Sequence, residues 1–511
     1  MRRGARWIDN EPVKVLLLYP RYPETFWSFT HALRFIGRKA AFPPLGLLTV
    51  AAMLPAAWDK KLVDLNAAAL SEKDLKWADY VFVSAMAVQQ TSAKDIIRRC
   101  KDLGKRIVAG GPLFTAGYEE FGFDEIDHLV LCEAENVMPA LVSDLEKGRA
   151  RHAYTSDTRP DMAISPIPLW SLVDRRTYQS LAIQYSRGCP FNCEFCDIVV
   201  MNGHEPRTKS SGQVLAELEA IHATGFRGSV FFVDDNFIGN RRRLKSDVLP
   251  AMSAWMDRKR RPFTFFTEAS VDLADDEALM EQMIGAGFNN IFIGIETPNP
   301  AGLVECNKIP NKDRDLLGSV KKMQEHGFEV MGGFIVGFDS DPPSIFQRQI
   351  SFIQKSGIVT AMVGVLNAPP GTTLFKRLKA AGRIRPGILG DNTDGSTNII
   401  PTMPYETLLR GYRRIVTAIY DPKRYYERVM TFYKSFRRRN RRRSDIQPRY
   451  FAALIRSIWQ LGILEAGRRY YWKMVIGILL KNPKVFPFAV SLAITGFHFH
   501  KVAERAGVEQ V

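Results

Sequence analysis

The sequence predicts an α/β protein with three regions: a flavodoxin-like doubly wound domain, a partial (β/α)6 barrel and a mostly helical C-terminal domain. Two separate series of short apolar runs alternate with amphipathic stretches, whereas the last hundred residues have helical periodicity and no such series. Continuously apolar runs are typical of parallel strands that helices cover on both faces. A chain of 511 residues is too long for one ordinary core. We therefore expect domains over 1–150, 181–395 and 396–511, with a linker over 151–180.

The first series contains five predicted strands, at residues 15–19, 61–65, 80–84, 106–110 and 128–131. Five such strands indicate a doubly wound sheet, in which ligands bind beyond the carboxyl ends of the strands. Small residues at these ends would let a large ligand approach the backbone. The candidate ligand-binding residues at these ends are Ser84, Ala85, Met86, Gly110, Gly111, Pro112 and Glu133.

The second series follows a segment with Pro160, Pro166 and Pro168, which predicts an ordered linker. Its predicted strands lie at residues 181–185, 229–233, 263–267, 291–295, 332–337 and 361–366. Helical patterns separate them. Six strand–helix units are too few to close an eight-stranded barrel. They predict a partial barrel with its chemistry at the carboxyl ends of the strands.

Three of the six cysteines lie in one short loop after a predicted strand, as Cys189, Cys193 and Cys196. Three thiolates in a C-x3-C-x2-C pattern can bind three irons of a [4Fe–4S] cluster and leave the fourth iron open to a substrate's amino and carboxylate groups. A zinc site is the alternative, but a closed zinc site needs a fourth ligand, and His204 is the only candidate nearby. So few cysteines also argue against a secreted disulfide framework and favour a reducing, cytoplasmic compartment.

The cysteine loop and the strands that follow it resemble the radical S-adenosylmethionine superfamily over about residues 181–380. The resemblance implies that Asp234 and Asp235 lie where the methionine amino group binds. It implies that Glu268 and Glu296 contact ribose or methionine. It also implies that the strand with Gly333 and Gly337 runs along the adenine. The alternatives are solvated strand ends or helix caps for the carboxylates, and close strand packing for the glycines.

The same resemblance implies the chemistry. One electron from the cluster cleaves S-adenosylmethionine into methionine and a 5′-deoxyadenosyl radical, which abstracts hydrogen from an unactivated carbon. The protein must then position the substrate and exclude solvent. A protein that donates single electrons is an expected partner.

The first domain resembles the cobalamin-binding domains that precede many radical S-adenosylmethionine cores. Residues from about 13 to 145 follow that pattern, including 43–48. The signature Asp-x-His-x-x-Gly is absent, because Tyr19-Pro20-Arg21-Tyr22 stands where its histidine is expected. Cobalamin would then have no histidine lower ligand. The candidate residues at the strand ends of this domain would hold it and should face the mouth of the barrel. The alternative is a bare flavodoxin-like domain that binds a nucleotide or nothing.

A corrinoid beside the cluster implies that one S-adenosylmethionine methylates cobalamin and a second generates the radical, so that the substrate carbon receives a methyl group. Methylthiotransferases share the core but need a second cluster. Cys100, Cys132 and Cys306 are isolated in the sequence and predict ordinary core positions instead. Two other functions stay open: a cobalamin-dependent cyclase without methyl transfer, and an iron–sulfur redox sensor with a nucleic-acid-binding tail.

The net charge of +16 is concentrated in residues 401–511, which hold about 22 Lys and Arg against about 7 Asp and Glu. Six arginines fall within residues 437–443, and aromatic and basic residues alternate in 468–473. This composition predicts a peripheral contact with an anionic membrane. The alternatives are a solvated arginine loop with helices packed on the barrel, and RNA binding, which no recognised RNA module supports. We expect neither a signal peptide nor a membrane-spanning helix, because Pro487 interrupts the best apolar run, 485–499.

The three regions together resemble the bacterial hopanoid methylases. Residues 425–429 and 492–499 look like the C-terminal tail of that branch. The resemblance implies a methyltransferase that acts on an unactivated carbon of a hopanoid or another isoprenoid lipid. We therefore expect a small-molecule or lipid substrate and a cytoplasmic protein at the periphery of the inner membrane.

Overall fold

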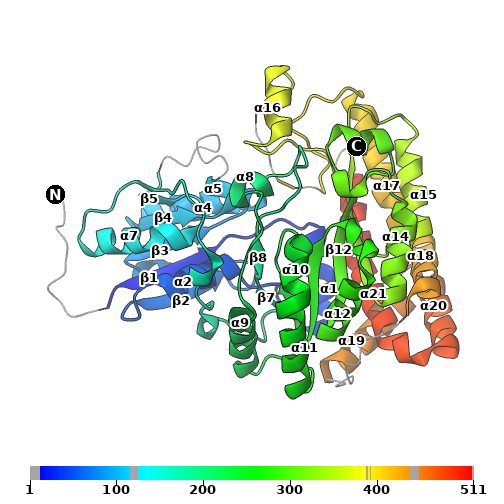
Figure 1. Cartoon of the computed structure of the whole chain (residues 1–511), viewed down its shortest axis with the longest axis horizontal. Helices are drawn as coiled ribbons and strands as arrows, with labels where there is room; N and C mark the ends of the chain where they lie inside the picture. The colour runs from blue at the N-terminus through cyan, green and yellow to red at the C-terminus, as the bar shows by residue number, and fades with distance from the viewer. Residues whose placement is uncertain (1–11, 116–124, 387–389, 392, 438–447, 509–511) are drawn as a thin grey trace.

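The computed structural model describes residues 12–115, 125–386, 390–391, 393–437 and 448–508. Two parallel sheets of six strands each organise these residues, and a bundle of helices from the C-terminal region packs against the second sheet (Figure 1). The predicted α/β class with two strand series is confirmed.

The first sheet has the strand order β2-β1-β3-β4-β5-β6, and every neighbouring pair is parallel. Its strands are β1 (Lys14–Tyr19), β2 (Asp59–Asp64), β3 (Tyr80–Ser84), β4 (Arg106–Gly110), β5 (His128–Val130) and β6 (Ala153–Tyr154). This order is that of a doubly wound, flavodoxin-like sheet. The short β6 was not predicted and lies in the segment predicted as a linker.

Helices cover both faces of this sheet because alternate residues of its strands point to opposite sides. Val15 and Leu17 pack with Leu47 of α2 (Leu45–Met53) and with α7 (Ala134–Glu146). On the other face, Leu16 and Leu18 pack with α3 (Glu72–Trp77), α4 (Gln90–Asp102) and α5 (Pro112–Thr115). Burial on both sides explains why the strands read as continuous apolar runs.

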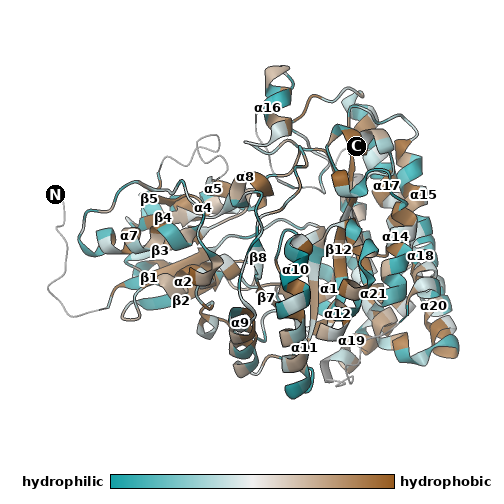
Figure 2. Cartoon of the chain, viewed as in Figure 1, coloured by the Kyte–Doolittle hydropathy of each residue, from teal (hydrophilic) through white to brown (hydrophobic). Residues whose placement is uncertain are grey.

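The second sheet is an open half-barrel with the order β14-β13-β12-β11-β10-β7, again parallel throughout. Its strands are β7 (Ser180–Ile183), β10 (Gly228–Phe232), β11 (Phe263–Ala269), β12 (Phe288–Glu296), β13 (Glu329–Val336) and β14 (Ala361–Val365). Its outer face is covered by α9 (Ser211–Ala223), α11 (Leu249–Arg258), α12 (Glu277–Ala286), α14 (Leu316–His326) and α15 (Ile345–Ser356). Figure 2 shows apolar and polar residues alternating along these helices, as expected where one side of a helix is buried.

A segment from the N-terminal part of the chain lies against the inner face of the half-barrel. The ring of Trp27, in η1 (Phe26–Ser28), lies 5.3 Å from Phe292 of β12. Phe42 lies 5.4 Å from Phe231 and 5.9 Å from Phe266. Between them, α1 (Thr30–Ile36) packs on C-terminal helices. This segment thus joins all three regions of the chain, an arrangement that no local sequence pattern predicted.

The described part of the C-terminal region is helical, as predicted. It contains α17 (Tyr405–Tyr420), α18 (Pro422–Ser435), α19 (Pro448–Trp459), η9 (Gln460–Leu464), α20 (Arg468–Lys481) and α21 (Phe486–Val508). Helix α21 contacts α1, α17 and α20, and α19 contacts α1 and α21. Figure 1 shows α21 behind β12 and α12, inside the bundle rather than at its edge.

One helix of the described residues, Pro483–Ala506, is long and apolar enough to cross a membrane by length and composition alone. The sequence predicted no segment of this length, because Pro487 and His498 interrupt the apolar run. Both residues lie within the helix. Pro487 is in its first turn, where proline is tolerated, and His498 is buried beside the carbonyl oxygens of Thr25 and Phe26. Since 56% of its most apolar 18-residue stretch is buried inside the protein, the helix also has the character of a core helix.

Candidate active site

The cysteine loop begins at the carboxyl end of the half-barrel, after β8 (Ser186–Arg187), and ends at α8 (Ile198–Asn202). Gly188 has φ +99°, and a Cβ at this position would lie 2.6 Å from the Glu205 carbonyl oxygen. Only glycine therefore fits before Cys189, whose N–H donates to the Gly203 carbonyl oxygen at 3.1 Å. The conformation of Gly188 and this backbone hydrogen bond fix where the loop begins.

The three thiols of this loop are partly buried and share one electrostatic environment. Burial raises the pKa of Cys189 and Cys193, and raises the pKa of Cys196 to about 12. The positive charge of Lys308 acts in the opposite direction on all three. Buried thiols beside a cation suit iron ligands, because thiolate–iron bonding removes the proton that burial otherwise retains.

The described residues contain no group of three or more His, Cys, Asp or Glu side chains placed to bind a single metal ion. This geometry does not favour the zinc alternative, which needs four ligands around one ion. A four-iron cube is larger than one ion and requires only one thiolate per iron. The donor set therefore fits a cluster held by Cys189, Cys193 and Cys196.

No sequence pattern predicted Lys308 as a site residue. Its Nζ donates to Glu296 Oε1 at 2.7 Å, and the two side chains are 16% and 8% exposed. Burial would lower the pKa of Lys308, but Glu296, Cys193 and Cys196 raise it above its usual value. The lysine lies in a short segment before η8 (Ile309–Asn311), where a single basic residue gives no sequence signal.

Glu296 ends β12 in an unusual backbone conformation, with φ +62°. The pairing of β12 with β13 shifts register between Gly294 and Glu296, so the strand turns as it reaches the site. A Cβ on Gly294 would overlap Glu296 Oε1 and lie 2.8 Å from Lys308 Nζ. A left-handed non-glycine residue costs about 1–3 kcal/mol and is typical of functional sites.

The carboxyl group of Glu268, in β11, makes no hydrogen bond or ion pair with the residues that the structure describes. Burial raises the pKa of its carboxyl to about 8, with Asp235 and Asp234 adding repulsion and Lys308 opposing it. The side chain is thus surrounded by protein although part of its surface is accessible. An unpartnered carboxylate among charged neighbours suits a ligand that brings donors, such as an amino group or ribose hydroxyls.

The two aspartates after β10 differ in their surroundings. Asp234 is buried, and both of its carboxylate oxygens accept hydrogen bonds from the loop before Cys189: from the N–H of Tyr185 at 3.1 Å, and from the N–H and hydroxyl of Ser186. Asp235 accepts hydrogen bonds from Asn202 Nδ2 at 3.0 Å and from the backbone N–H of Gly188. Both aspartates therefore hold the start of the cysteine loop, Asp234 at Tyr185 and Ser186 and Asp235 at Gly188.

The two glycines of the fifth strand segment have packing partners. A Cβ on Gly333 would lie 3.0 Å from the ring of Phe292, and Gly337 has φ +103° with Leu408 beside it. The N–H of Gly337 donates to Asp341 at 3.0 Å. These contacts favour the close-packing alternative, and a place along adenine stays a prediction for both.

The strand ends of the first sheet face the cysteine loop. Arg187, two residues before Cys189, donates to Glu133 at 2.7 Å and to Glu135 at 2.8 and 2.9 Å. Arg207, in β9 (Arg207–Thr208), donates to Glu133 at 2.6 and 3.0 Å. The predicted approach of this domain to the barrel mouth is confirmed at the end of β5. The carboxylate of Glu133, predicted as a cobalamin contact, instead accepts hydrogen bonds from Arg187 and Arg207.

The remaining predicted cobalamin residues follow β3 and β4 at this edge. Gly111 has φ +94°, and a Cβ there would lie 2.6 Å from Ser84 Oγ, so the two strand ends touch. Met86 is 42% exposed, whereas Ala85 is buried. Gly110 and Pro112 complete this small-residue surface. Apart from Met86, this surface has no bulky side chain, which fits a large, flat ligand.

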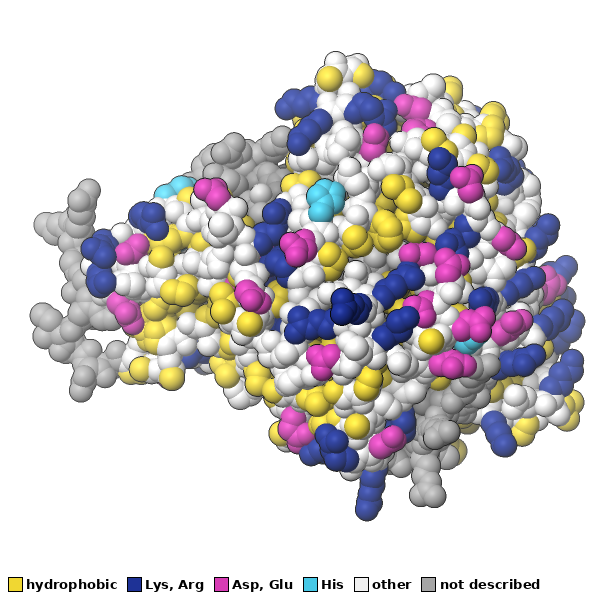
Figure 3. Space-filling view, viewed as in Figure 1, with side chains coloured by type: hydrophobic (Ala, Val, Ile, Leu, Met, Phe, Trp, Pro, Cys, Tyr) yellow, Lys and Arg dark blue, Asp and Glu magenta, His cyan; other side chains and the backbone are white. Residues whose placement is uncertain are grey.

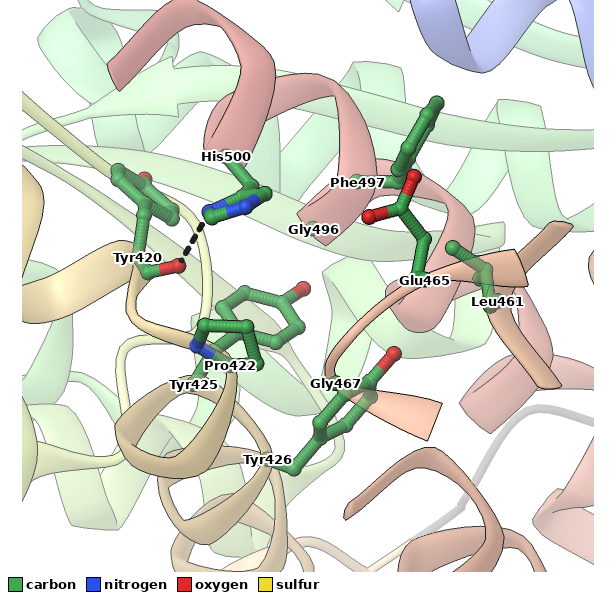
Figure 4. Close-up of a pocket in the computed structure, with 10 residues that line it drawn as sticks. All are labelled: Tyr420, Pro422, Tyr425, Tyr426, Leu461, Glu465, Gly467, Gly496, Phe497 and His500. Carbon is green, nitrogen blue, oxygen red and sulfur yellow. Dashed lines mark hydrogen bonds between the residues drawn. The ribbon is translucent and has the colours of Figure 1, made fainter. Parts of the chain in front are cut away.

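The pocket in Figure 4 lies elsewhere, among the C-terminal helices. It measures about 380 Å³ including its open side and is lined by Tyr420, Pro422, Tyr425, Tyr426, Leu461, Glu465, Gly467, Gly496, Phe497 and His500. The hydroxyl of Tyr425 donates to the Leu492 carbonyl oxygen at 2.6 Å, and His500 bonds the Tyr420 carbonyl oxygen at 3.0 Å. It contains no predicted cofactor residue, and we assign it no ligand.

Comparison with known families gives three matches along the chain. The B12 binding domain family matches residues 36–142, the radical SAM superfamily matches residues 183–351, and a domain of unknown function, DUF4070, matches residues 372–510.

Two relatives align over nearly the whole chain. An uncharacterized methyltransferase of Synechocystis sp. is 38% identical over 96% of this chain and 92% of its own length. The hopanoid C-2 methylase of Rhodopseudomonas palustris is 34% identical over 92% of this chain and 90% of its own length. The chain belongs to the cobalamin-dependent radical S-adenosylmethionine methyltransferases.

The fold is also that of a solved member of the cobalamin-dependent radical enzymes. The structure of OxsB with aqua-cobalamin and S-adenosylmethionine bound superposes with a TM-score of 0.60 at 13% identity, covering 97% of this chain and 80% of that chain. As a cobalamin-dependent radical S-adenosylmethionine methyltransferase, this enzyme uses a [4Fe–4S] cluster, S-adenosylmethionine and cobalamin. The expectation of a radical enzyme with these three cofactors is confirmed.

Proposed function

We propose that this methyltransferase transfers a methyl group to an unactivated carbon of a hopanoid or a related isoprenoid lipid. The observation that carries the proposal is the 34% identity with a hopanoid C-2 methylase, because it spans 92% of this chain and includes the C-terminal helices. A substrate of this class is apolar and membrane-bound, which agrees with the apolar and basic character of those helices.

Within this proposal, each cofactor has a set of residues that fits it. Cys189, Cys193 and Cys196 hold the cluster. Asp235, Glu268 and Glu296 contact S-adenosylmethionine, and the surface after β3 and β4 holds cobalamin. When bound, these groups supply one-electron reduction, hydrogen abstraction and methyl donation.

The protein's own residues orient these groups and exclude water. Arg187 ties the first domain to the cysteine loop through Glu135. Lys308 holds Glu296 in one position at the end of β12. Asp234 fixes the loop backbone by accepting hydrogen bonds from the N–H groups of Tyr185 and Ser186. Such fixed geometry matters for a radical enzyme, because a stray hydrogen donor would quench the reaction.

Two partners complete the proposal. A protein that donates single electrons must reduce the cluster. The basic C-terminal region makes a peripheral contact with the inner membrane from the cytoplasmic side, where the lipid substrate is reached.

The test is direct methylation. Protein purified anaerobically with cobalamin is incubated with a hopanoid in vesicles, a strong reductant and S-adenosylmethionine labelled in its methyl group. We expect a labelled methylhopanoid by mass spectrometry, and S-adenosylhomocysteine and 5′-deoxyadenosine in equal amounts. Cys193→Ala is the inactive control. Formation of 5′-deoxyadenosine without any labelled lipid, for a panel of hopanoids and other isoprenoids, would exclude the proposed substrate class; a ring-forming product without S-adenosylhomocysteine would indicate a cyclase.

A further inference from the structure

An exposed apolar stripe runs along α19 and η9. Its residues recur every four positions, which places them on one side of a helix. They are Phe451, Ile455, Trp459 and Ile463, which are 63, 53, 59 and 49% exposed, and Leu464 extends the stripe at 54%. We name these five residues the α19 stripe. Isolated apolar residues on a surface are ordinary, but a row of five large ones in a single segment is not.

The opposite side of the same helix is fixed to the protein. Ala453, Ser457 and Leu461 are buried, and Ser457 Oγ lies 3.0 Å from the Tyr471 hydroxyl. Arg456 donates to the carbonyl oxygen of Phe35 in α1 at 2.9 Å. The helix therefore cannot rotate to bury the α19 stripe against its own bundle.

The segment that carries the stripe is rich in basic residues. Between residues 450 and 484 the chain has one acidic residue, Glu465, and six basic ones: Arg456, Arg468, Arg469, Lys473, Lys481 and Lys484. The sequence just before α19 adds the six arginines within 437–443. Figure 3 shows many Lys and Arg side chains, with some Asp and Glu side chains between them, along the edge of the molecule where α18 and α20 lie. The net charge of this part of the chain is thus strongly positive.

The apolar helix Tyr450–Leu464 is shorter than a helix that crosses a membrane. A bilayer core needs about 20 residues of helix. A short helix with an apolar face, an aromatic residue suited to the interface and basic neighbours is typical of helices that lie in the plane of a membrane surface.

We propose that the α19 stripe docks on the surface of an anionic lipid bilayer, with its apolar side chains at the acyl boundary and Arg468, Arg469 and Lys473 near the headgroups. This inference rests on the proposed function for its biological purpose, since a lipid substrate must be taken from a membrane, but its evidence is the stripe itself. It assigns a membrane-docking role to part of the domain of unknown function, residues 372–510.

Side-chain packing links α19 to the catalytic half-barrel through α1 and Trp27. Helix α19 packs on α1, and α1 follows directly after Trp27, whose ring contacts Phe292 inside the half-barrel. A membrane contact at the α19 stripe would therefore hold the barrel at a fixed position relative to the bilayer.

Vesicle flotation tests the proposal with the full-length protein, purified anaerobically with its cofactors. We expect it to float with vesicles of phosphatidylglycerol and phosphatidylcholine and to float weakly with phosphatidylcholine alone. The double variant Phe451→Ser, Trp459→Ser should lower the partition coefficient at least tenfold. Ile164→Ser is the matched control, because Ile164 is 57% exposed and lies in the linker, away from the stripe. Equal binding by the double variant and the wild type would overturn the proposal.

A second variant covers the case in which the double variant folds poorly, which its cobalamin and cluster absorption would reveal. Trp459→Phe keeps an apolar ring, so it should bind vesicles like the wild type but lose energy transfer to dansyl-labelled lipid. Unchanged energy transfer would place Trp459 away from the bilayer and overturn the docking orientation. A wild-type dimer in lipid-free sedimentation that the double variant abolishes would identify the stripe as a subunit interface and also overturn the proposal.

These outcomes are separable from those of the methylation test. Vesicle binding that depends on the α19 stripe, without hopanoid methylation, would leave the docking surface standing and remove only the substrate. Methylation of a hopanoid in detergent by a variant that no longer binds vesicles would support both.

Discussion

Arg187 and Glu135 form a bidentate ion pair with N–O distances of 2.8 and 2.9 Å. The pair joins the cysteine loop of the half-barrel to the first turn of α7 in the first domain. The side chains are 15% and 3% exposed. Burial alone would raise the pKa of Glu135, but the hydrogen bonds and charge of Arg187 hold it below its usual value. The relative position of the two cofactor domains therefore depends on a buried charge pair.

Arg187→Ala should destabilise the protein by about 3 kcal/mol, because it leaves Glu135 buried without its arginine partner and removes one of the two arginines that bind Glu133. Arg187→Lys should recover only part of this loss, since an ammonium cannot reproduce a two-pronged contact. Urea unfolding followed by circular dichroism measures the effect. Arg314→Ala is the control, because its two-pronged partner Asp275 is 57% exposed; that change should cost about 1 kcal/mol or less. Equal losses in both variants would contradict a special role for Arg187.

Gly294→Ala should disturb the ion pair of Glu296 and Lys308, because the added methyl group would overlap the Glu296 carboxylate. We expect cleavage of S-adenosylmethionine to fall by about tenfold or more while the iron content stays unchanged. Gly285→Ala, in α12 with nothing within 4 Å of the new Cβ, is the matched substitution and should stabilise the helix by about 0.5–1 kcal/mol. Normal cleavage by Gly294→Ala would show that the pair tolerates displacement.

Cys193→Ala should abolish the four-iron centre, whereas Cys306→Ala should retain it. The two residues are electrostatic neighbours, and burial raises the pKa of Cys306 to about 12. Only Cys193 belongs to the C-x3-C-x2-C loop, so the pair separates ligation from proximity. Iron and sulfide analysis with electron paramagnetic resonance of the reduced protein is the measurement. A cluster that survives in Cys193→Ala and is lost in Cys306→Ala would reverse the assignment.

Glu329 gives a prediction about pH. Its carboxyl is 5% exposed and accepts a hydrogen bond from Asn290, and burial raises its pKa from about 4.5 to about 7. The folded state then holds this proton more tightly than the unfolded state, so its contribution is complete below pH 4.5 and is lost as pH rises through 7. Glu329→Gln stays neutral and should gain about 1–3 kcal/mol over the wild type at pH 8, with little difference near pH 5.

Urea unfolding at the two pH values tests this prediction. Glu146→Gln, at an exposed position near the end of α7, should follow the wild type at both. A gain for Glu329→Gln that is the same at pH 5 and pH 8 would show that the carboxyl does not titrate in this range.

Much of the fold and part of the site could be predicted from the sequence, and the physical reason differs between the strands and the cysteine loop. Strands such as β3 and β4 matched their predicted bounds because burial on both faces leaves an uninterrupted apolar run. The cysteine loop was readable because three ligands within eight positions rarely serve another purpose.

The rest depends on contacts between distant segments. Lys308 lies twelve positions after Glu296 in an irregular segment, so only the folded chain brings their charges together. Glu133 was predicted at the correct strand end, but its partners Arg187 and Arg207 are 54 and 74 positions away. The two-residue β6 is too short to produce a pattern, and the position of α1 is set by helices near the other end of the chain.

The contact between the two ends of the chain has a consequence for biosynthesis. His498 of α21 lies 3.1 Å from the Thr25 carbonyl oxygen, and Phe499 packs on Phe26 with ring centroids 5.3 Å apart. The residues on the two sides of this contact are 473 positions apart in the chain. The contact cannot form while the ribosome still holds α21, so the docking of η1 on α21 is a late step of folding that follows the synthesis of the cysteine loop.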